Sequence, residues 1–173
     1  NPSGHLAETF PRRLTDTPMA PTFGQDPNHE YYSEGVFMGY RYYDTHEMHV
    51  LFPFGHGLSY TTFEYTNMAV DENAHGATVR FDLTNTGDRA GQAVPQLYVA
   101  NHASHVPMPT KELRAFTKVA VEPGETKAVT LKLNRRDLSW WCEGKSRWQA
   151  DSGDYEIMIG DSSRDIRLQT KLT

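Results

Sequence analysis

The chain has 173 residues, a hydrophobic fraction of 38% and a charged fraction of 23%, values typical of one globular domain, or of a small domain with part of another, and not of a disordered chain. No apolar run approaches the ~20 residues that a membrane-spanning helix needs. The net charge is −5 and there is no basic patch, which argues against nucleic acid as a partner. The single Cys142 excludes an internal disulfide and leaves the cellular compartment open.

Residues 1–65 differ in composition from the rest of the chain. They hold thirteen of the seventeen Phe and Tyr residues, only six Leu, Ile or Val residues, and three basic against eight acidic side chains. Their apolar positions follow neither a 3.6-residue nor a 2-residue period, and Pro and Gly are frequent. We interpret the segment as a wrapping tail with one or two strands that depends on another surface. A short helix over 32–38, capped by Ser33, is an alternative against which Gly35 argues.

From residue 62 the pattern changes to short alternating segments. The stretches 79–83, 129–133 and 155–159 place apolar side chains at every second position, which predicts strands with one buried and one solvent-facing side. Met158 falls on the expected solvent-facing side of the last stretch. The expected strands are 63–70, 79–83, 94–100, 113–121, 129–133, 155–159 and 165–172.

Turn residues separate these strands. Residues 85–88, with the sequence Asn-Thr-Gly-Asp, form one expected turn. In residues 122–125, Pro123 presets φ near ~−65° and Gly124 allows the positive φ of a type II turn. About seven short strands over ~100 residues predict a mainly β protein with an immunoglobulin-like or fibronectin III-like sandwich, and the absence of a disulfide favours the fibronectin III type.

An ordered series of motifs runs through the whole chain. In chain order the motifs are Asn1-Pro2-Ser3-Gly4-His5-Leu6-Ala7-Glu8-Thr9-Phe10-Pro11, Glu34-Gly35-Val36-Phe37-Met38-Gly39-Tyr40-Arg41-Tyr42-Tyr43-Asp44, Phe52-Pro53-Phe54-Gly55-His56-Gly57-Leu58-Ser59-Tyr60-Thr61, Asn85-Thr86-Gly87-Asp88-Arg89-Ala90-Gly91, Gln96-Leu97-Tyr98-Val99, Lys111-Glu112-Leu113, Pro123-Gly124-Glu125-Thr126, Arg136-Asp137-Leu138-Ser139, Gly153-Asp154-Tyr155-Glu156 and Ser162-Ser163-Arg164-Asp165-Ile166. Each motif alone has low specificity, but the ordered set resembles the C-terminal part of a glycoside hydrolase family 3 enzyme of the β-glucosidase type. His5 stands where the family more often has Lys, a departure that touches nothing catalytic.

The resemblance implies a division of the chain into two parts. Residues 1–61 would end the family's α/β sandwich domain and serve as a linker, and residues 62–173 would form its fibronectin III-like domain. The family hydrolyses β-linked glucosides from the non-reducing end with retention, using an Asp of a (β/α)₈ barrel and, in β-glucosidases, a Glu upstream of the Asn1 motif. Neither stretch is present, so the resemblance carries over no catalytic or sugar-binding residue. The opening residues show no signal-peptide features, and we expect the chain to start within a longer protein.

Carboxylates in the tail are the candidates for a hidden catalytic pair. Retaining glycosidases need two carboxyl groups about 5–5.5 Å apart. Glu30 with Glu34, or Glu34 with Asp44, fit by position. The alternative is that Glu34 orders a turn or pairs with Arg41, and we favour it because pairing is the usual state of a partly buried carboxylate.

Possible metal ligands and the single thiol are the next candidates for chemistry. Asp44, His46, Glu47 and His49 offer oxygen and nitrogen ligands at close spacing, but not in the H-E-x-x-H pattern of a zinc-binding helix. We therefore favour a solvated loop over a metal site. Cys142 has no Cys–His context and is interpreted as an inert thiol. No catalytic, metal or cofactor residue is assigned, and no cofactor is expected.

Three tryptophans near the C-terminus allow two interpretations. Trp140, Trp141 and Trp148 could offer flat ring faces to a sugar, or they could pack in a hairpin and the core, as aromatic burial favours. A binding role requires rings that share one exposed face.

The resemblance implies a non-catalytic C-terminal segment of a retaining β-glucosidase, inactive by itself, that stabilises the catalytic domains and shapes the rim of the cleft. Its expected partners are the barrel and the α/β sandwich portion of the same enzyme, a β-glucoside bound by the whole enzyme, and a second copy in a homo-oligomer, with neither nucleic acid nor membrane. The alternative is a stand-alone carbohydrate-binding or adhesion module, against which the aromatic tail argues, because an independent module would not carry a large surface that needs a partner.

Overall fold

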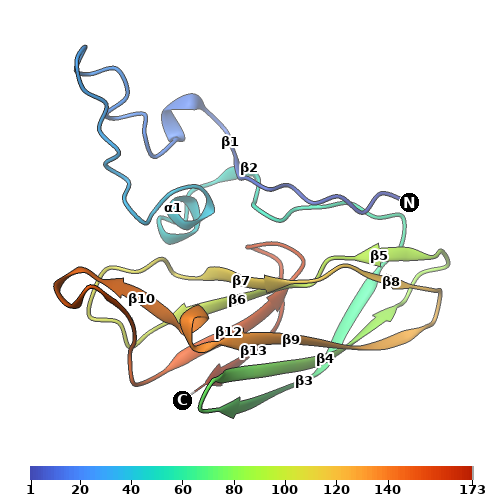
Figure 1. The fold of residues 1–173 in the computed structure, drawn as a ribbon. Helices are drawn as coiled ribbons and strands as arrows, with labels where there is room; N and C mark the ends of the chain where they lie inside the picture. Colours follow the sequence, from blue (N-terminus) through green and yellow to red (C-terminus); the bar gives the residue numbers. More distant parts are fainter. Residues whose placement is uncertain (173) are drawn as a thin grey trace.

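Two antiparallel sheets pack face to face at the centre of the structure, a computed structural model that describes residues 1–172 (Figure 1). One sheet has the strand order β3 (Phe63–Asn73), β4 (Gly76–Asn85) and β9 (Thr126–Asn134). The other has the order β13 (Ile166–Leu172), β12 (Tyr155–Gly160), β6 (Gln96–Asn101) and β7 (Glu112–Phe116). Because β4 continues to β6, and β9 to β12, the chain passes from one sheet to the other between strands. This is the fibronectin III-like sandwich that the sequence predicts.

The core lies between the facing sides of the two sheets. Alternation places every second side chain of each strand on this side, as the sequence pattern requires. The core side chains that are least exposed are Val79, Leu83, Leu97, Ile157 and Ile159, each 0% exposed. Phe81, which is 2% exposed, stacks on Tyr65 of the neighbouring strand with ring centroids 5.9 Å apart.

One strand that the sequence predicts as continuous is divided, and one strand is additional. The stretch 113–121 breaks into β7 and β8 (Val119–Val121), and the predicted strand 94–100, which corresponds to β6, is preceded by the unpredicted strand β5 (Gly91–Ala93). β5 and β8 pair with each other in a two-stranded sheet of their own. Pro95 lies between β5 and β6, and it has no N–H to donate to a ladder, which accounts for the separation of these two strands.

The N-terminal segment forms little regular structure. It contains β1 (Phe10–Pro11), a 3₁₀ turn η1 (Leu14–Asp16), the six-residue helix α1 (Tyr40–Thr45) and β2 (Val50–Phe52). β1 and β2 pair with each other, so the expected one or two strands are present. No helix forms over 32–38, where residues 33–36 are a turn instead. None of the helices in residues 1–172 has the length and apolar character that crossing a membrane requires.

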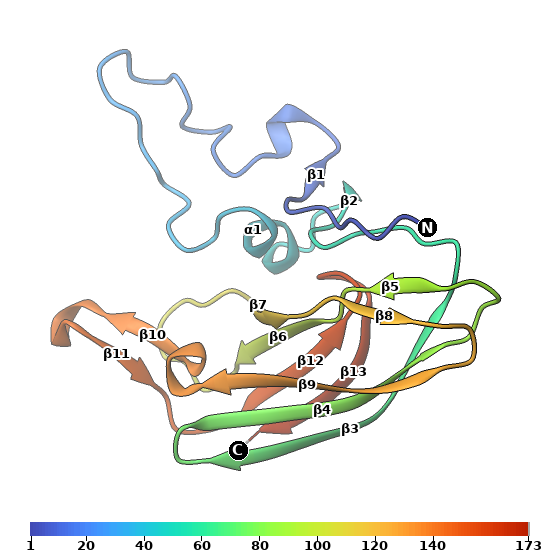
Figure 2. The ribbon, with the colours of Figure 1, turned by 45° about the vertical axis from the view of Figure 1, so that its right-hand side comes forward.

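The outer face of the four-stranded sheet is covered, contrary to the alternation-based prediction. Tyr98, Ala100 and Met158 point away from the core, yet they are 0%, 2% and 7% exposed. Tyr40 and Phe54 of the N-terminal segment pack against them. Figure 2 shows this segment lying along the side of the sandwich that carries β6 and β7. The prediction of a solvent-facing Met158 is therefore wrong, because the aromatic tail replaces water on that side.

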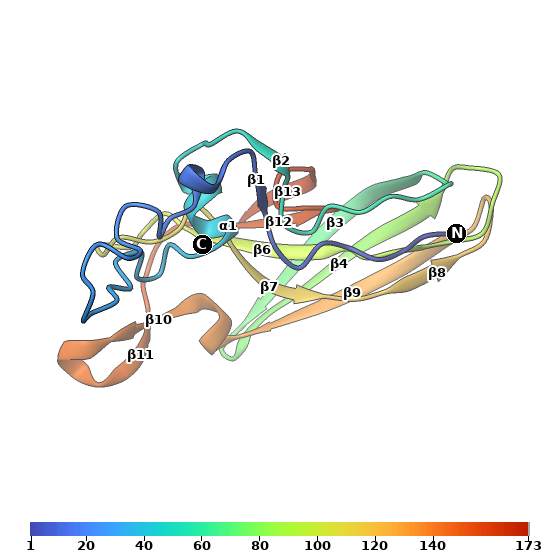
Figure 3. The ribbon, with the colours of Figure 1, turned by 90° about the horizontal axis from the view of Figure 1, so that it is seen from above.

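A separate hairpin projects from the sandwich beside this covered side. It consists of β10 (Ser139–Cys142) and β11 (Arg147–Ala150), with Trp141 paired opposite Trp148, and it was not among the expected strands. Seen from above, it extends away from both main sheets (Figure 3). The 3₁₀ turns η2 (Arg135–Leu138) and η3 (Glu143–Lys145) precede β10 and connect the two strands.

The turn at residues 122–125 has the predicted conformation. Gly124 has φ 74°, and the Glu125 N–H donates to the Glu122 carbonyl at 3.0 Å. An added Cβ at Gly124 would meet no atom within 4 Å, so any cost of a side chain arises from the backbone alone.

We therefore expect Gly124→Val to lower the free energy of unfolding by about 1–2 kcal/mol, because a β-branched residue is forced into the left-handed region. Gly144→Val is the matched control, since Gly144 also has open space around its Cβ position but no positive φ. Urea denaturation of both variants measures the difference. Equal midpoints for the two variants would show that the turn does not constrain Gly124.

Candidate functional site

The joint, meaning the contact between residues 1–62 and the strands from β3 onward, is the most densely bonded feature outside the two sheets. Its apolar part is a cluster of aromatic rings. Tyr40 stacks on Phe54 with ring centroids 4.5 Å apart, and its edge meets Tyr98 at 6.2 Å. The Leu113 N–H donates to the Tyr40 hydroxyl at 2.7 Å. Helix α1 is thus positioned by its aromatic side chains and not by helix propensity.

A buried amide connects three chain segments next to these rings. The Tyr98 hydroxyl donates to Gln96 Oε1 at 2.6 Å, and burial raises the pKa of Tyr98, so the hydroxyl keeps its proton. Gln96 Nε2 in turn donates to the carbonyls of Gly55 at 3.1 Å and Asp161 at 2.7 Å. An added Cβ at Gly55 would lie 2.0 Å from Gln96 Oε1, so only glycine allows this approach.

The polar part of the joint is centred on Asp44, whose side chain is 3% exposed. Arg164, from the connection between β12 and β13, donates from Nε to Asp44 Oδ1 at 2.7 Å. The same guanidinium donates to the carbonyls of Met48 at 2.8 Å and Tyr43 at 3.1 Å. Lys111 Nζ lies 3.4 Å from Asp44 Oδ2, close enough for an ion pair, although that oxygen accepts no hydrogen bond within residues 1–172. The carboxylate therefore depends mainly on Arg164.

The candidate catalytic carboxylates lie in different surroundings, and Oε2 of Glu34 is buried without a hydrogen-bond partner within residues 1–172. Arg41 pairs with Glu112 at 3.1 Å, and not with Glu34. The backbone carbonyl of Glu34 accepts from the Phe37 N–H at 2.9 Å. Of the two structural roles expected for Glu34, a turn or a pair with Arg41, the turn is therefore the one that forms. Glu30 is exposed.

The expected solvated loop over 44–49 is only partly correct. Asp44 belongs to α1 and is buried, whereas Glu47 and His49 are exposed. The His46 ring packs against Tyr42 with centroids 4.4 Å apart. Within the described residues no group of three or more His, Cys, Asp or Glu side chains is placed to hold a metal ion.

The first residue of the chain and a buried turn complete the joint. Asn1 Oδ1 accepts from the Tyr60 N–H at 2.9 Å, and Asn1 Nδ2 donates to the Ala90 carbonyl at 2.9 Å. Asn85, 0% exposed, accepts at Oδ1 from the Thr61 hydroxyl at 2.6 Å. Motifs that are far apart in the sequence, from the first residues to Arg164, therefore meet in one place.

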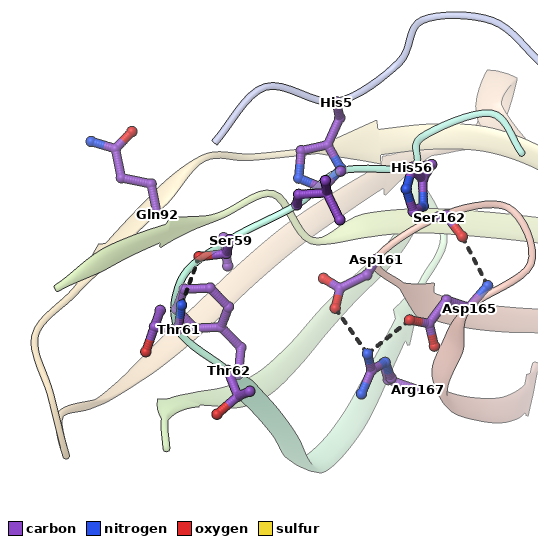
Figure 4. A pocket seen from close by; sticks show the side chains of 14 residues that line it. His5, His56, Ser59, Thr61, Thr62, Gln92, Asp161, Ser162, Asp165 and Arg167 are labelled. Atoms are coloured by element: carbon purple, nitrogen blue, oxygen red, sulfur yellow. Dashed lines mark hydrogen bonds and ion pairs between the residues drawn. The ribbon is translucent and has the colours of Figure 1, made fainter. Parts of the chain in front are cut away.

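A pocket of about 270 Å³ opens at the end of the joint (Figure 4), and Ser59 in its lining donates to Asn1 Oδ1 at 3.1 Å. The N-terminal segment, the start of β3, β5 and the connection into β13 each supply part of its lining. Arg167 bridges two carboxylates there, with Nη2 lying 3.3 Å from Asp161 and 2.7 Å from Asp165. The Tyr65 hydroxyl donates to Asp161 Oδ1. Burial raises the pKa of the Asp161 carboxyl, against the opposing effects of the Tyr65 hydrogen bond and the Arg167 charge.

The tryptophans pack on one another and on neighbouring side chains. Trp141 and Trp148 meet edge to face, with centroids 5.8 Å apart and planes at 65°, and the Arg136 guanidinium lies 4.5 Å from the Trp148 centroid. Trp140 Nε1 donates to Asp151 at 2.8 Å. Cys142 is a free, partly buried thiol. The rings do not share one flat face, and they have the arrangement expected for hairpin packing.

Comparison with known proteins gives a consistent result along the whole chain. Residues 93–163 match the fibronectin type III-like domain family. The chain is 45% identical to Thermostable beta-glucosidase B of Acetivibrio thermocellus and 45% identical to an Exo-alpha-(1->6)-L-arabinopyranosidase of Bifidobacterium breve, over 98% and 96% of its length. These matches span 23% and 22% of the relatives, so the chain covers about a fifth of their length.

A solved structure agrees with the sequence comparison. The GH3 beta-glucosidase of Bifidobacterium adolescentis superposes with a TM-score of 0.95 at 39% identity, over 99% of this chain and 26% of that one. The superposition includes the N-terminal segment, and so the joint, and not the sandwich alone.

Proposed function

We propose that the chain is a segment of a glycoside hydrolase family 3 enzyme of the β-glucosidase type, to members of which it is similar along nearly its whole length, and that it serves this enzyme as a non-catalytic part that stabilises the catalytic domains. The whole enzyme would hydrolyse terminal non-reducing β-D-glucosyl residues with retention. The observation that carries this proposal is similarity along 98% of the chain to only about a fifth of the relatives, at 45% identity. The catalytic parts of the enzyme then lie outside these residues.

The exposed apolar surface of the N-terminal segment supports a partner of this kind. Leu14, Phe23, Tyr32, Leu58 and Tyr60 are each more than 60% exposed, although their side chains are among the largest apolar ones in the chain. Isolated domains rarely expose contiguous apolar patches of this sort without a partner surface. We propose that residues 1–61 complete the α/β sandwich domain of the enzyme and run as its linker, and that residues 62–173 form the accessory fibronectin III-like domain.

Only some of the large apolar side chains between residues 52 and 60 pack within this chain. Phe54 packs into the joint, but Phe52, Leu58 and Tyr60 remain 44%, 72% and 70% exposed. The exposed area of Phe52 and Tyr60 is available to the rest of the enzyme, whereas Leu58 lines the pocket at the end of the joint.

Sugar specificity is proposed to lie outside this segment. The chain is equally identical, at 45%, to relatives named for a β-glucosidase and for an arabinopyranosidase. Overall identity to this segment therefore does not separate the two named activities. The alternative of a stand-alone carbohydrate-binding module gains no support from the tryptophan hairpin, whose rings lie at 65° to each other.

A segment exchange tests the proposal. The corresponding segment of the Acetivibrio enzyme is deleted, or replaced by this chain, and hydrolysis of an aryl β-glucoside is measured for each protein and for the 173-residue chain alone. We expect activity in the exchanged enzyme, and none above a buffer blank in the truncated enzyme or in the chain alone. Full activity of the truncated enzyme would make the segment dispensable. Turnover by the chain alone that disappears in Glu34→Gln would make Glu34 catalytic.

A further inference from the structure

The pocket at the end of the joint has walls from four separate stretches of the chain (Figure 4). His5 and His56 belong to the N-terminal segment, Phe63 begins β3, Gln92 belongs to β5, and Arg167 belongs to β13. Its volume of about 270 Å³ lies just below the range that holds drug-sized ligands, and so suits a smaller solute. Any molecule bound there touches both the tail and the sandwich.

The charges in the pocket disfavour ions of either sign. Two carboxylates, those of Asp161 and Asp165, face any incoming anion. The guanidinium of Arg167 lies within 3.3 Å of both carboxylates and occupies the position a divalent cation would need. The ligand class that remains is neutral and polar.

Unused hydrogen-bonding capacity surrounds the cavity. Within residues 1–172 the Arg167 side chain contacts its partners through Nη2, so the N–H groups of Nε and Nη1 have no protein acceptor there. Gln92 and Asp165 also line the pocket and are exposed, so their polar atoms are accessible to an incoming ligand. Free donors and free acceptors therefore lie side by side, an arrangement that hydroxyl groups satisfy because each one both donates and accepts.

An apolar side completes the lining. Leu58 and Phe63 line the same pocket as the polar groups. The carbon face of a sugar ring packs on such side chains while its hydroxyls reach the polar ones. We propose that this pocket binds a neutral polyhydroxylated ligand of monosaccharide size, at a site separate from the hydrolytic centre and independent of the function proposed above.

Binding at this position stabilises the docked tail. Because the site exists only when the N-terminal segment lies against the sandwich, a ligand shifts the equilibrium toward the docked state by mass action. At a free concentration of about ten times Kd, the ratio of docked to released protein rises about 11-fold. Proteolysis of the tail slows by a similar factor when cleavage occurs from the released state.

The test is an NMR titration of the ¹⁵N-labelled chain with D-glucose, with myo-inositol and, separately, with inorganic phosphate. We expect saturable shifts of the Gln92, Asp165 and Arg167 amides with the two polyols at millimolar concentration, and no saturable shift with phosphate. Gln92→Trp places an indole at the mouth of the pocket and should abolish the shifts. Gln169→Trp, at an exposed position of β13 outside the pocket, should leave them unchanged.

Three results would overturn the inference. They are linear, non-saturating shifts with both polyols, saturation by phosphate instead, and polyol binding that survives Gln92→Trp. Because the measurement uses the chain alone and no hydrolysis, its failure leaves the segment exchange unaffected, and failure of the exchange leaves the binding result unaffected.

Discussion

Arg164→Ala should lower the free energy of unfolding by roughly 3 kcal/mol and release the N-terminal segment. Removal of one partner of a buried ion pair costs about 3–5 kcal/mol, and the low end applies because the Arg164 side chain is 31% exposed. Asp44, at 3% exposed, would keep only the Lys111 contact at 3.4 Å. The carbonyls of Met48 and Tyr43 would lose their donor as well.

Urea denaturation and limited proteolysis measure the two parts of this effect. In the unaltered chain the first cuts should fall between Thr15 and Tyr32, and in the variant cleavage should extend toward Phe52. Arg147→Ala is the control, because Arg147 is exposed and forms no ion pair within residues 1–172, so its removal should cost less than about 0.5 kcal/mol. A proteolytic pattern shared by both variants would show that Arg164 does not hold the tail.

Asn85→Ala should destabilise the sandwich by about 3–5 kcal/mol. The side chain is 0% exposed and has four partners: its Oδ1 accepts from the Thr61 hydroxyl and the Gly87 N–H, and its Nδ2 donates to the carbonyls of Arg89 and Val121. Each buried group left without a partner costs about 1–3 kcal/mol, and water entering the cavity relieves part of the sum.

Thermal and urea unfolding of Asn85→Ala and of Asn73→Ala make the comparison. Asn73 lies exposed at the end of β3, where its Oδ1 accepts only from the His75 N–H at 2.8 Å, so its loss should cost less than about 1 kcal/mol. An Asn85→Ala variant as stable as Asn73→Ala would mean that the turn at 85–88 is held by its backbone alone.

Features that depend on neighbours in the sequence could be predicted. The alternation over 79–83 and 129–133 reflects a side-chain period of two, which any strand with one core-facing side must have. The turn at Gly124 was predicted because Pro123 and Gly124 restrict φ locally, whatever surrounds them. The fibronectin III-like sandwich followed from the number and spacing of such local signals.

Features that arise from distant contacts could not be predicted. Helix α1 forms from aromatic residues without a helical period, since Tyr40 is held by Phe54 and Tyr98. Alternation alone predicts that the side of β12 that carries Met158 faces solvent. Nothing in the neighbouring sequence indicates that the distant N-terminal tail covers this side. The ion pair between Asp44 and Arg164 could not be predicted for the same reason, because it depends on a contact that only the folded chain creates.

The separation of Asp44 and Arg164 has a consequence for synthesis of the protein. The two residues are 120 positions apart, so Arg164 is translated well after Asp44. At about 5–20 residues per second, roughly 6–24 s pass between the appearance of the aromatic tail and the appearance of its ionic anchor. During that interval the tail is an exposed apolar segment on a nascent chain, the kind of species that chaperones retain and that aggregates when they do not. Expression yield should therefore respond to translation rate and chaperone supply more strongly than the stability of the finished fold would indicate.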